Sequence, residues 1–116
     1  MKNLKYIQLT NNPIKDLSPI TDKELSELFI GSINGLDFTQ LQNMKISRQL
    51  SIFKCGLKDL MQLKGITAER FIFWHNDIEN FPENELNWIN AKVIDLSNNP
   101  ISEFDKRNNW VNYAAE

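Results

Sequence analysis

The sequence of 116 residues is poor in the residues that build cross-links and metal sites. It holds one cysteine, Cys55, so an intramolecular disulfide and a multi-cysteine zinc site are both excluded. Its one histidine, His75, has no second histidine with which to bind a metal. We therefore expect a fold held by packing alone, with no metal and no other cofactor.

Long apolar runs and an excess of positive charge are also missing. No stretch of about 18 apolar residues occurs, and the first residues lead into a polar segment, unlike a secretory signal. Thirteen Lys and Arg against fifteen Asp and Glu give a formal net charge of -2, without the positive balance that attracts phosphate backbones. We expect a cytoplasmic protein that binds neither membranes nor nucleic acid.

Few residues are arranged for catalysis. The four glycines are scattered and form no phosphate-binding loop. Cys55 and His75 are the residue types of a nucleophile and its base, but the strand pattern described below places Cys55 inside the fold, where a thiol is inert. Acidic pairs such as Glu83 with Glu85 are interpreted as solvated surface charges. The sequence therefore predicts that the chain is not an enzyme.

Two segments near opposite ends of the chain, Leu9–Ile14 and Leu96–Ile101, nearly coincide, reading LTNNPI and LSNNPI. Each belongs to a longer pattern in which apolar residues and one polar position recur at fixed spacing. The pattern is found four times, as Leu4-x-x-Ile7-x-Leu9-x-x-Asn12-x-Ile14, Leu50-x-Ile52-x-x-Cys55-x-Leu57, Phe71-x-Phe73-x-x-Asn76-x-Ile78 and Ala91-x-x-Ile94-x-Leu96-x-x-Asn99-x-Ile101.

This arrangement resembles the leucine-rich repeat family, and residues 14–20 resemble the internalin style of bacterial repeat. The stretch 25–38 fits if one residue is inserted, so that Asn34 takes the polar position. The predicted structural ladder of polar positions is then Asn12, Asn34, Cys55, Asn76 and Asn99, spaced by 22, 21, 21 and 23 residues. The resemblance covers residues 1–116 as a single domain. It implies an α/β repeat solenoid of about five coils, with a parallel β-sheet on the concave side and short helices and turns on the convex side.

Strict alternation of apolar side chains independently predicts five short strands, each with one buried face. They are centred on residues 7–9, 28–30, 50–52, 71–73 and 94–96. An Asn at the polar position can donate to and accept from the backbone of adjacent coils, whereas an apolar residue would leave those groups unpaired.

The segments between strands predict short helical turns at Leu41–Ile46 and Leu60–Ile66, and the proline of Pro82–Ile89 suits a first helical turn. Residues 105–116 are predicted to cap the last coil, because terminal coils need a cover. The first strand has an uncovered edge to which a second copy of the chain can add.

The outward positions of the middle strands are conspicuously apolar. Phe29, Phe53, Ile72 and Trp74 are expected to cluster, because outward residues of neighbouring strands face one another. An exposed apolar cluster within a polar and charged rim is typical of a protein-binding surface. The predicted partner-binding residues are these four anchors and four surrounding residues, Tyr6, Arg70, His75 and Asp95.

The sequence therefore predicts a protein-protein interaction module that binds a protein partner through its concave face, as an inhibitor or immunity-type protein by analogy. Two alternatives stay open. One is a homo-oligomeric structural repeat protein assembled through the first coil, and the other is the recognition module of a larger bacterial effector.

Overall fold

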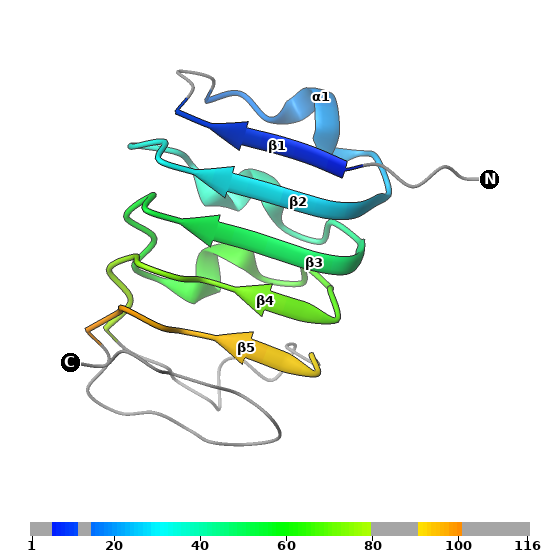
Figure 1. Cartoon of the computed structure of the whole chain (residues 1–116). Coiled ribbons are helices and arrows are strands. Elements are labelled where there is room, and N and C mark those ends of the chain that lie inside the picture. Colours follow the sequence, from blue (N-terminus) through cyan, green and yellow to red (C-terminus); the bar gives the residue numbers. More distant parts are fainter. Residues whose placement is uncertain (1–5, 12–14, 80–90, 101–116) are drawn as a thin grey trace.

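Residues 6–11, 15–79 and 91–100 are described by the structure, a computed structural model of the chain. Five strands form one parallel sheet whose spatial order is the order of the sequence (Figure 1). Their bounds are β1 Tyr6–Thr10, β2 Leu25–Gly31, β3 Ile46–Phe53, β4 Arg70–Ile72 and β5 Val93–Asp95. This arrangement is compatible with an α/β fold, and the chain is compact, with a Cα radius of gyration of 13.4 Å.

The predicted five strands and their parallel pairing are confirmed. The register aligns Leu28 with Ile7 of β1 and Leu50 of β3, and Leu50 in turn aligns with Phe71 of β4. The side chains at positions 28, 50 and 71 have at most 1% of their surface exposed, because alternation directs them all to the same covered face. Strands β2 and β3 are longer than expected, and their pairing shifts register between Leu25 and Glu27.

The described parts of the connecting segments cover one face of the sheet and leave the other open (Figure 1). They contain one short α-helix, α1 Ser18–Thr21, and two 3-10 turns, η1 Phe38–Leu41 and η2 Leu60–Leu63. The core lies between these segments and the sheet, and its buried residues form a single cluster. No helix within the described ranges is long and apolar enough to cross a membrane.

The helical turns begin where an aspartate precedes them. Asp37 accepts a hydrogen bond from the Thr39 backbone N–H at 3.0 Å, and Asp59 accepts one from the Met61 N–H at 2.9 Å. Each carboxylate satisfies a backbone donor that the first turn leaves free. The prediction of a turn at Leu41–Ile46 was therefore wrong, since the turn starts at Phe38 and ends at Leu41. The turn predicted at Leu60–Ile66 is confirmed over its first four residues, and α1 was not anticipated.

Two asparagine side chains bridge neighbouring segments inside the fold. The Asn76 Oδ1 accepts from the Cys55 and Leu57 N–H groups at 3.1 and 3.4 Å, and its Nδ2 donates to the Ile52 carbonyl at 2.8 Å. Asn99 repeats this one strand further along the sheet: its Oδ1 accepts from the Asn76 and Ile78 N–H groups, and its Nδ2 donates to the Phe73 carbonyl at 2.7 Å. The predicted bridging role is confirmed for both.

Cys55 occupies the equivalent position one strand before Asn76, as predicted. Its thiol is directed at the Ile30 carbonyl at 3.7 Å and the Phe53 carbonyl at 3.2 Å. Asn76 donates to the carbonyl of Ile52, and Ile30 is the residue of β2 that aligns with Ile52. The thiol of Cys55 therefore makes the equivalent contact one strand earlier, and it is a weaker hydrogen-bond donor than an amide. Cys55 is 3% exposed, and this burial raises the pKa of its thiol.

The prediction for Asn34 was wrong. The side chain of Asn34 is exposed, and Ile33, which is 2% exposed, stands in line with Cys55. The extra residue of this segment lies after the buried position, in a turn where Gly35 adopts φ +76°. The calls on Asn12, on Pro82–Ile89 and on the cap at 105–116 fall outside the described residues.

A left-handed backbone position follows each strand. The residues there are Asn11, Ser32, Lys54, His75 and Asn98, with φ values between 51° and 61°. None of them is glycine, although only glycine adopts this conformation without strain. This edge row, as we call these five residues, lies at the carboxyl end of the sheet and turns the chain away from it.

Candidate functional site

The open face of the sheet is the candidate functional surface. Among the described residues, the exposed large hydrophobic side chains are Tyr6 on β1, which is 57% exposed, and Trp74 just after β4, which is 38% exposed. Single exposed apolar residues are common, and it is their grouping with other apolar side chains that points to a contact surface. The remaining outward aromatics, Phe29 and Phe53, are half-buried.

These aromatics form two separate pairs. The ring centroids of Tyr6 and Phe29 lie 5.3 Å apart, and those of Phe53 and Trp74 lie 6.1 Å apart. Both distances are within the range of favourable ring contacts. Within the described residues, no ring contact joins the two pairs. Of the four predicted anchors, Phe53 and Trp74 are joined by a ring contact, whereas the ring of Phe29 pairs with Tyr6.

Gly31 determines where the Phe53 ring lies. A Cβ atom placed on Gly31 would be 2.3 to 2.8 Å from three ring carbons of Phe53, which means that the ring covers the bare backbone of the neighbouring strand. The pairing register puts the two residues directly opposite each other. Because Gly31 has no side chain, the Phe53 ring can lie directly over the backbone of β2, and from this position it contacts Trp74.

Two residues of the edge row, Lys54 and His75, flank Trp74. The Lys54 Nζ lies 5.8 Å from the centre of the indole ring, within cation-π range. The His75 ring meets the same indole edge-on, with centroids 5.5 Å apart. His75 is exposed and follows the strand at a turn, as the sequence predicted. We call Phe53, Ile72, Trp74, Lys54 and Arg70 the β3–β4 patch.

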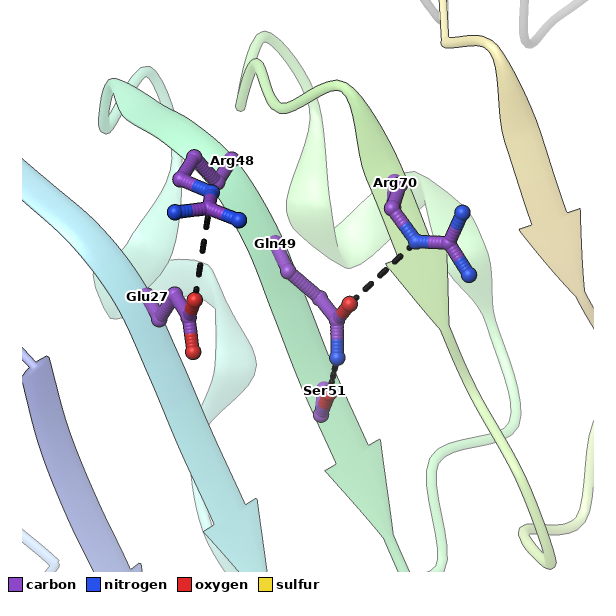
Figure 2. A network of polar contacts seen from close by, with 5 residues as sticks. All are labelled: Glu27, Arg48, Gln49, Ser51 and Arg70. Atoms are coloured by element: carbon purple, nitrogen blue, oxygen red, sulfur yellow. Dashed lines mark hydrogen bonds and ion pairs between the residues drawn. The ribbon is translucent and has the colours of Figure 1, made fainter.

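A polar network crosses the amino-terminal half of the same face (Figure 2). The Arg70 Nε donates to the Gln49 Oε1 at 3.3 Å, and the Gln49 Nε2 donates to the Ser51 hydroxyl at 2.9 Å. Ser51 is 3% exposed, so this chain of hydrogen bonds anchors an exposed guanidinium to a buried hydroxyl. Arg48 and Glu27 lie beside it as an ion pair with a separation of 3.9 Å.

Asp95 and Ile72 complete the placement of the predicted residues. The two are aligned on β4 and β5, and both are half-buried. The Asp95 carboxylate accepts from the Ser97 backbone N–H at 2.9 Å and also from the Ser97 hydroxyl. The structure thus brings Phe53, Arg70, Ile72, Trp74, His75 and Asp95 to adjoining strands β3 to β5. Tyr6 and Phe29 lie on β1 and β2, which continue the same sheet on the other side of β3.

Sequence reasoning missed three contributors to this surface. Gly31 was not recognised as the residue that the Phe53 ring covers, because only the register shows what lies opposite it. Ser51 holds an outward position, aligned with Phe29, yet it is buried there and accepts a hydrogen bond from Gln49. Arg48 was not considered because the register shift in β2 and β3 disturbs strict alternation. A glycine in the outward position of a strand was the one signal available from the sequence.

The described residues hold no group of three or more His, Cys, Asp or Glu side chains suited to a metal ion. The Cys55 thiol faces backbone carbonyls inside the core, and its raised pKa keeps it protonated at neutral pH. Comparison of the chain with models of protein families, with curated proteins and with solved structures gave no match.

Proposed function

We propose that the chain is a leucine-rich-repeat-type solenoid that binds a protein partner through the open face of its sheet, without catalysis. The observation that carries this proposal is the Phe53–Trp74 pair, an aromatic contact on the open face of the sheet in which Trp74 is exposed to solvent. Rigid exposed aromatics are the residue types that dominate binding energy at protein interfaces.

The repeated geometry supports the solenoid interpretation. The strands follow one another in sequence order, and Cys55, Asn76 and Asn99 make matching contacts at spacings of 21 and 23 residues. A parallel sheet that uses the same bridging position in successive segments is what a stack of similar coils requires. The left-handed position after every strand supports the same conclusion.

The surroundings of the pair support binding rather than a solvated surface. Ile72 lies beside Trp74 on the outward side of β4, and Arg70, His75 and Asp95 provide polar groups around it. An apolar centre with a polar rim is the usual anatomy of a protein interface. Occlusion of a partner's surface, as by an inhibitor or immunity-type protein, is the mechanism we propose. Localisation in the cytoplasm is part of the same proposal.

The test compares the wild-type chain with Trp74→Ser and with the double variant Phe53→Ser/Trp74→Ser. Partners are captured from the source cell, produced as pure proteins, and titrated against each variant by calorimetry. Truncating one central aromatic commonly costs about 2 kcal/mol of binding free energy, so the double change is expected to raise the dissociation constant roughly a thousandfold.

Lys64→Ala is the matched control, because Lys64 is exposed on the side of the connecting segments. It is expected to bind like the wild type. Circular dichroism and urea unfolding establish that each variant is folded. Undiminished binding by the folded double variant would place the interface elsewhere and overturn the proposal.

Self-association through β1 is a second candidate, favoured by the character of that strand. Its sequence, YIQLT, has no charge, and its core-facing residues Ile7 and Leu9 are only partly buried, whereas Leu28 and Ile30 on β2 are fully buried. Uncharged edge strands are templates for pairing with another chain. Sedimentation velocity over a range of concentrations tests this. Gln8→Lys is expected to shift a dimer to monomer, and the control Asn34→Lys, in an exposed turn, is not; a wild-type chain that stays monomeric throughout would refute it.

A further inference from the structure

We propose that the β3–β4 patch selects a partner segment in which an apolar side chain is flanked by carboxylates. This inference rests on the proposed function, because it assumes that the open face is the binding surface. What it adds is the chemistry of the partner, which follows from the cations of this patch that have no carboxylate of their own.

Arg70 is held ready for an acceptor from outside. Its Nε is occupied by Gln49, which is itself fixed by the buried Ser51 hydroxyl. The terminal nitrogens of the guanidinium point away from Gln49 (Figure 2). Among the described residues the ion pairs are Arg48 with Glu27 and Lys92 with Glu69, and Arg70 is in neither. A planar fork fixed along one edge matches the two oxygens of a carboxylate.

Lys54 provides the second cation at the other end of the patch. Its ammonium lies over the Trp74 ring, and no ion pair of the described residues includes it. The contact with the ring leaves the donors of the ammonium that point away from the indole available. A carboxylate on the partner can therefore meet Lys54 while an apolar side chain rests against Phe53 and Trp74.

The acidic groups of the same face are already engaged. Glu27 pairs with Arg48, and Asp95 accepts from the backbone N–H and the hydroxyl of Ser97. The two cations of the β3–β4 patch, Arg70 and Lys54, are thus in no ion pair of the described residues, although the whole chain carries a net charge of -2. Negatively charged groups on a partner would therefore complement this part of the face. An interface that buried the two cations opposite neutral or basic groups would leave them uncompensated.

The geometry sets the order of groups along the partner. Arg70 and Ile72 project from the same side of β4, Trp74 follows two residues after the strand ends, and the Lys54 ammonium lies over its ring. At the rise of an extended chain, about 3.3 Å per residue, Arg70 and Trp74 are separated by up to roughly 13 Å along the backbone. A partner segment that spans this distance places one carboxylate at each end and an apolar side chain between them.

A library of random, unmodified peptides displayed on phage tests this selection, because its only side-chain anions are carboxylates. The library is panned against the wild-type chain, Arg70→Gln, Arg70→Lys and the double variant Phe53→Ser/Trp74→Ser. Lys92→Gln is the matched control, since it removes one positive charge from the next strand outside the patch. Peptides enriched on the wild type are then synthesised, and their dissociation constants are measured.

We expect enriched peptides with Asp or Glu on both sides of an apolar residue. Their affinity should fall about tenfold or more for Arg70→Gln, fall less for Arg70→Lys, and stay unchanged for Lys92→Gln. Peptides that bind the patch yet carry no acidic preference, or an empty selection, would overturn this inference. Acidic peptides that bind the double variant as tightly as the wild type would overturn it as well. The proposed function stands or falls separately, on the titration of the full-length partner against the same double variant.

Discussion

Asn76 and Asn99 are the residues whose individual chemistry contributes most clearly to the fold. Each amide accepts from two backbone N–H groups and donates to a backbone carbonyl of a neighbouring segment. These roles were predictable, because both residues sit at a fixed distance from an apolar pair. The placement of Asn34 was not, since an extra residue before or after the buried position leaves the same apolar spacing. Only the burial of Ile33 distinguishes the two.

Replacing Asn76 or Asn99 with alanine is expected to destabilise the fold by about 1–3 kcal/mol, since buried backbone groups would lose their partners. The two losses should be similar, because the amides make matching contacts. Asn34→Ala, at an exposed position, is the control and should unfold like the wild type. Urea unfolding measures all three, and an Asn76→Ala chain as stable as the wild type would contradict the bridging role.

Cys55 gives the native state a specific dependence on alkaline pH. Burial raises the pKa of the folded thiol, so the thiol of the unfolded chain ionises first as the pH rises. The stabilisation is therefore complete below the ordinary thiol pKa and is lost as the pH climbs toward the raised native value. Urea midpoints across this range should fall more steeply for the wild type than for Cys55→Ala. Rapid labelling of the native thiol at neutral pH would show that Cys55 is not buried.

At the scale of elements, the strands were easier to predict than the turns between them. Alternation marks a strand directly, and the residues at 28–30 and 50–52 lie where it placed them. The 3-10 turns follow a different signal, an aspartate two residues before a backbone donor, as in Asp37 with Thr39. That signal was present in the sequence at Asp16, Asp37 and Asp59, but apolar spacing alone does not reveal it. The hydrogen bonds from Thr39 lower the pKa of the Asp37 carboxyl.

The contact between the ends of β2 and β3 predicts an effect of Gly31→Ala. The added methyl group would collide with the Phe53 ring, which can swing outward because it is a side chain on an open face. The fold should survive, while the contact between Phe53 and Trp74 is lost and binding at the β3–β4 patch weakens about tenfold or more. Trp74 fluorescence and partner titration report the change. Ser32→Ala, at the next residue, is the control, and unchanged binding by Gly31→Ala would show that the position of the Phe53 ring is unimportant.

For the molecule as a whole, the sequence predicted which side chains face outward but not how they group across the sheet. The split between the Tyr6–Phe29 and Phe53–Trp74 pairs depends on where each ring leans. That direction follows from contacts such as the one over Gly31, which involve residues far apart in the sequence. The network of Ser51, Gln49 and Arg70 is equally a product of register, since it joins two strands.

The strand order predicts a gradient of local stability. β2 and β3 are the longest strands and are paired on both sides, and Leu28 and Leu50 within them are fully buried. β1 stands at one end of the order, with Ile7 and Leu9 only partly buried. Hydrogen exchange should therefore be slowest for the amides of β2 and β3 and faster for those of β1. Equal protection across the sheet would show that the molecule opens as one unit.

The edge row also makes this chain suitable for diversification. Asn, Ser, Lys and His all adopt the same left-handed conformation there, so this backbone path accepts several different residue types. Successive members stand on strands about 4.8 Å apart, and their side chains lie outside the core. A combinatorial library randomised at these five positions would vary the side chains along one edge of the sheet while the core residues stay the same.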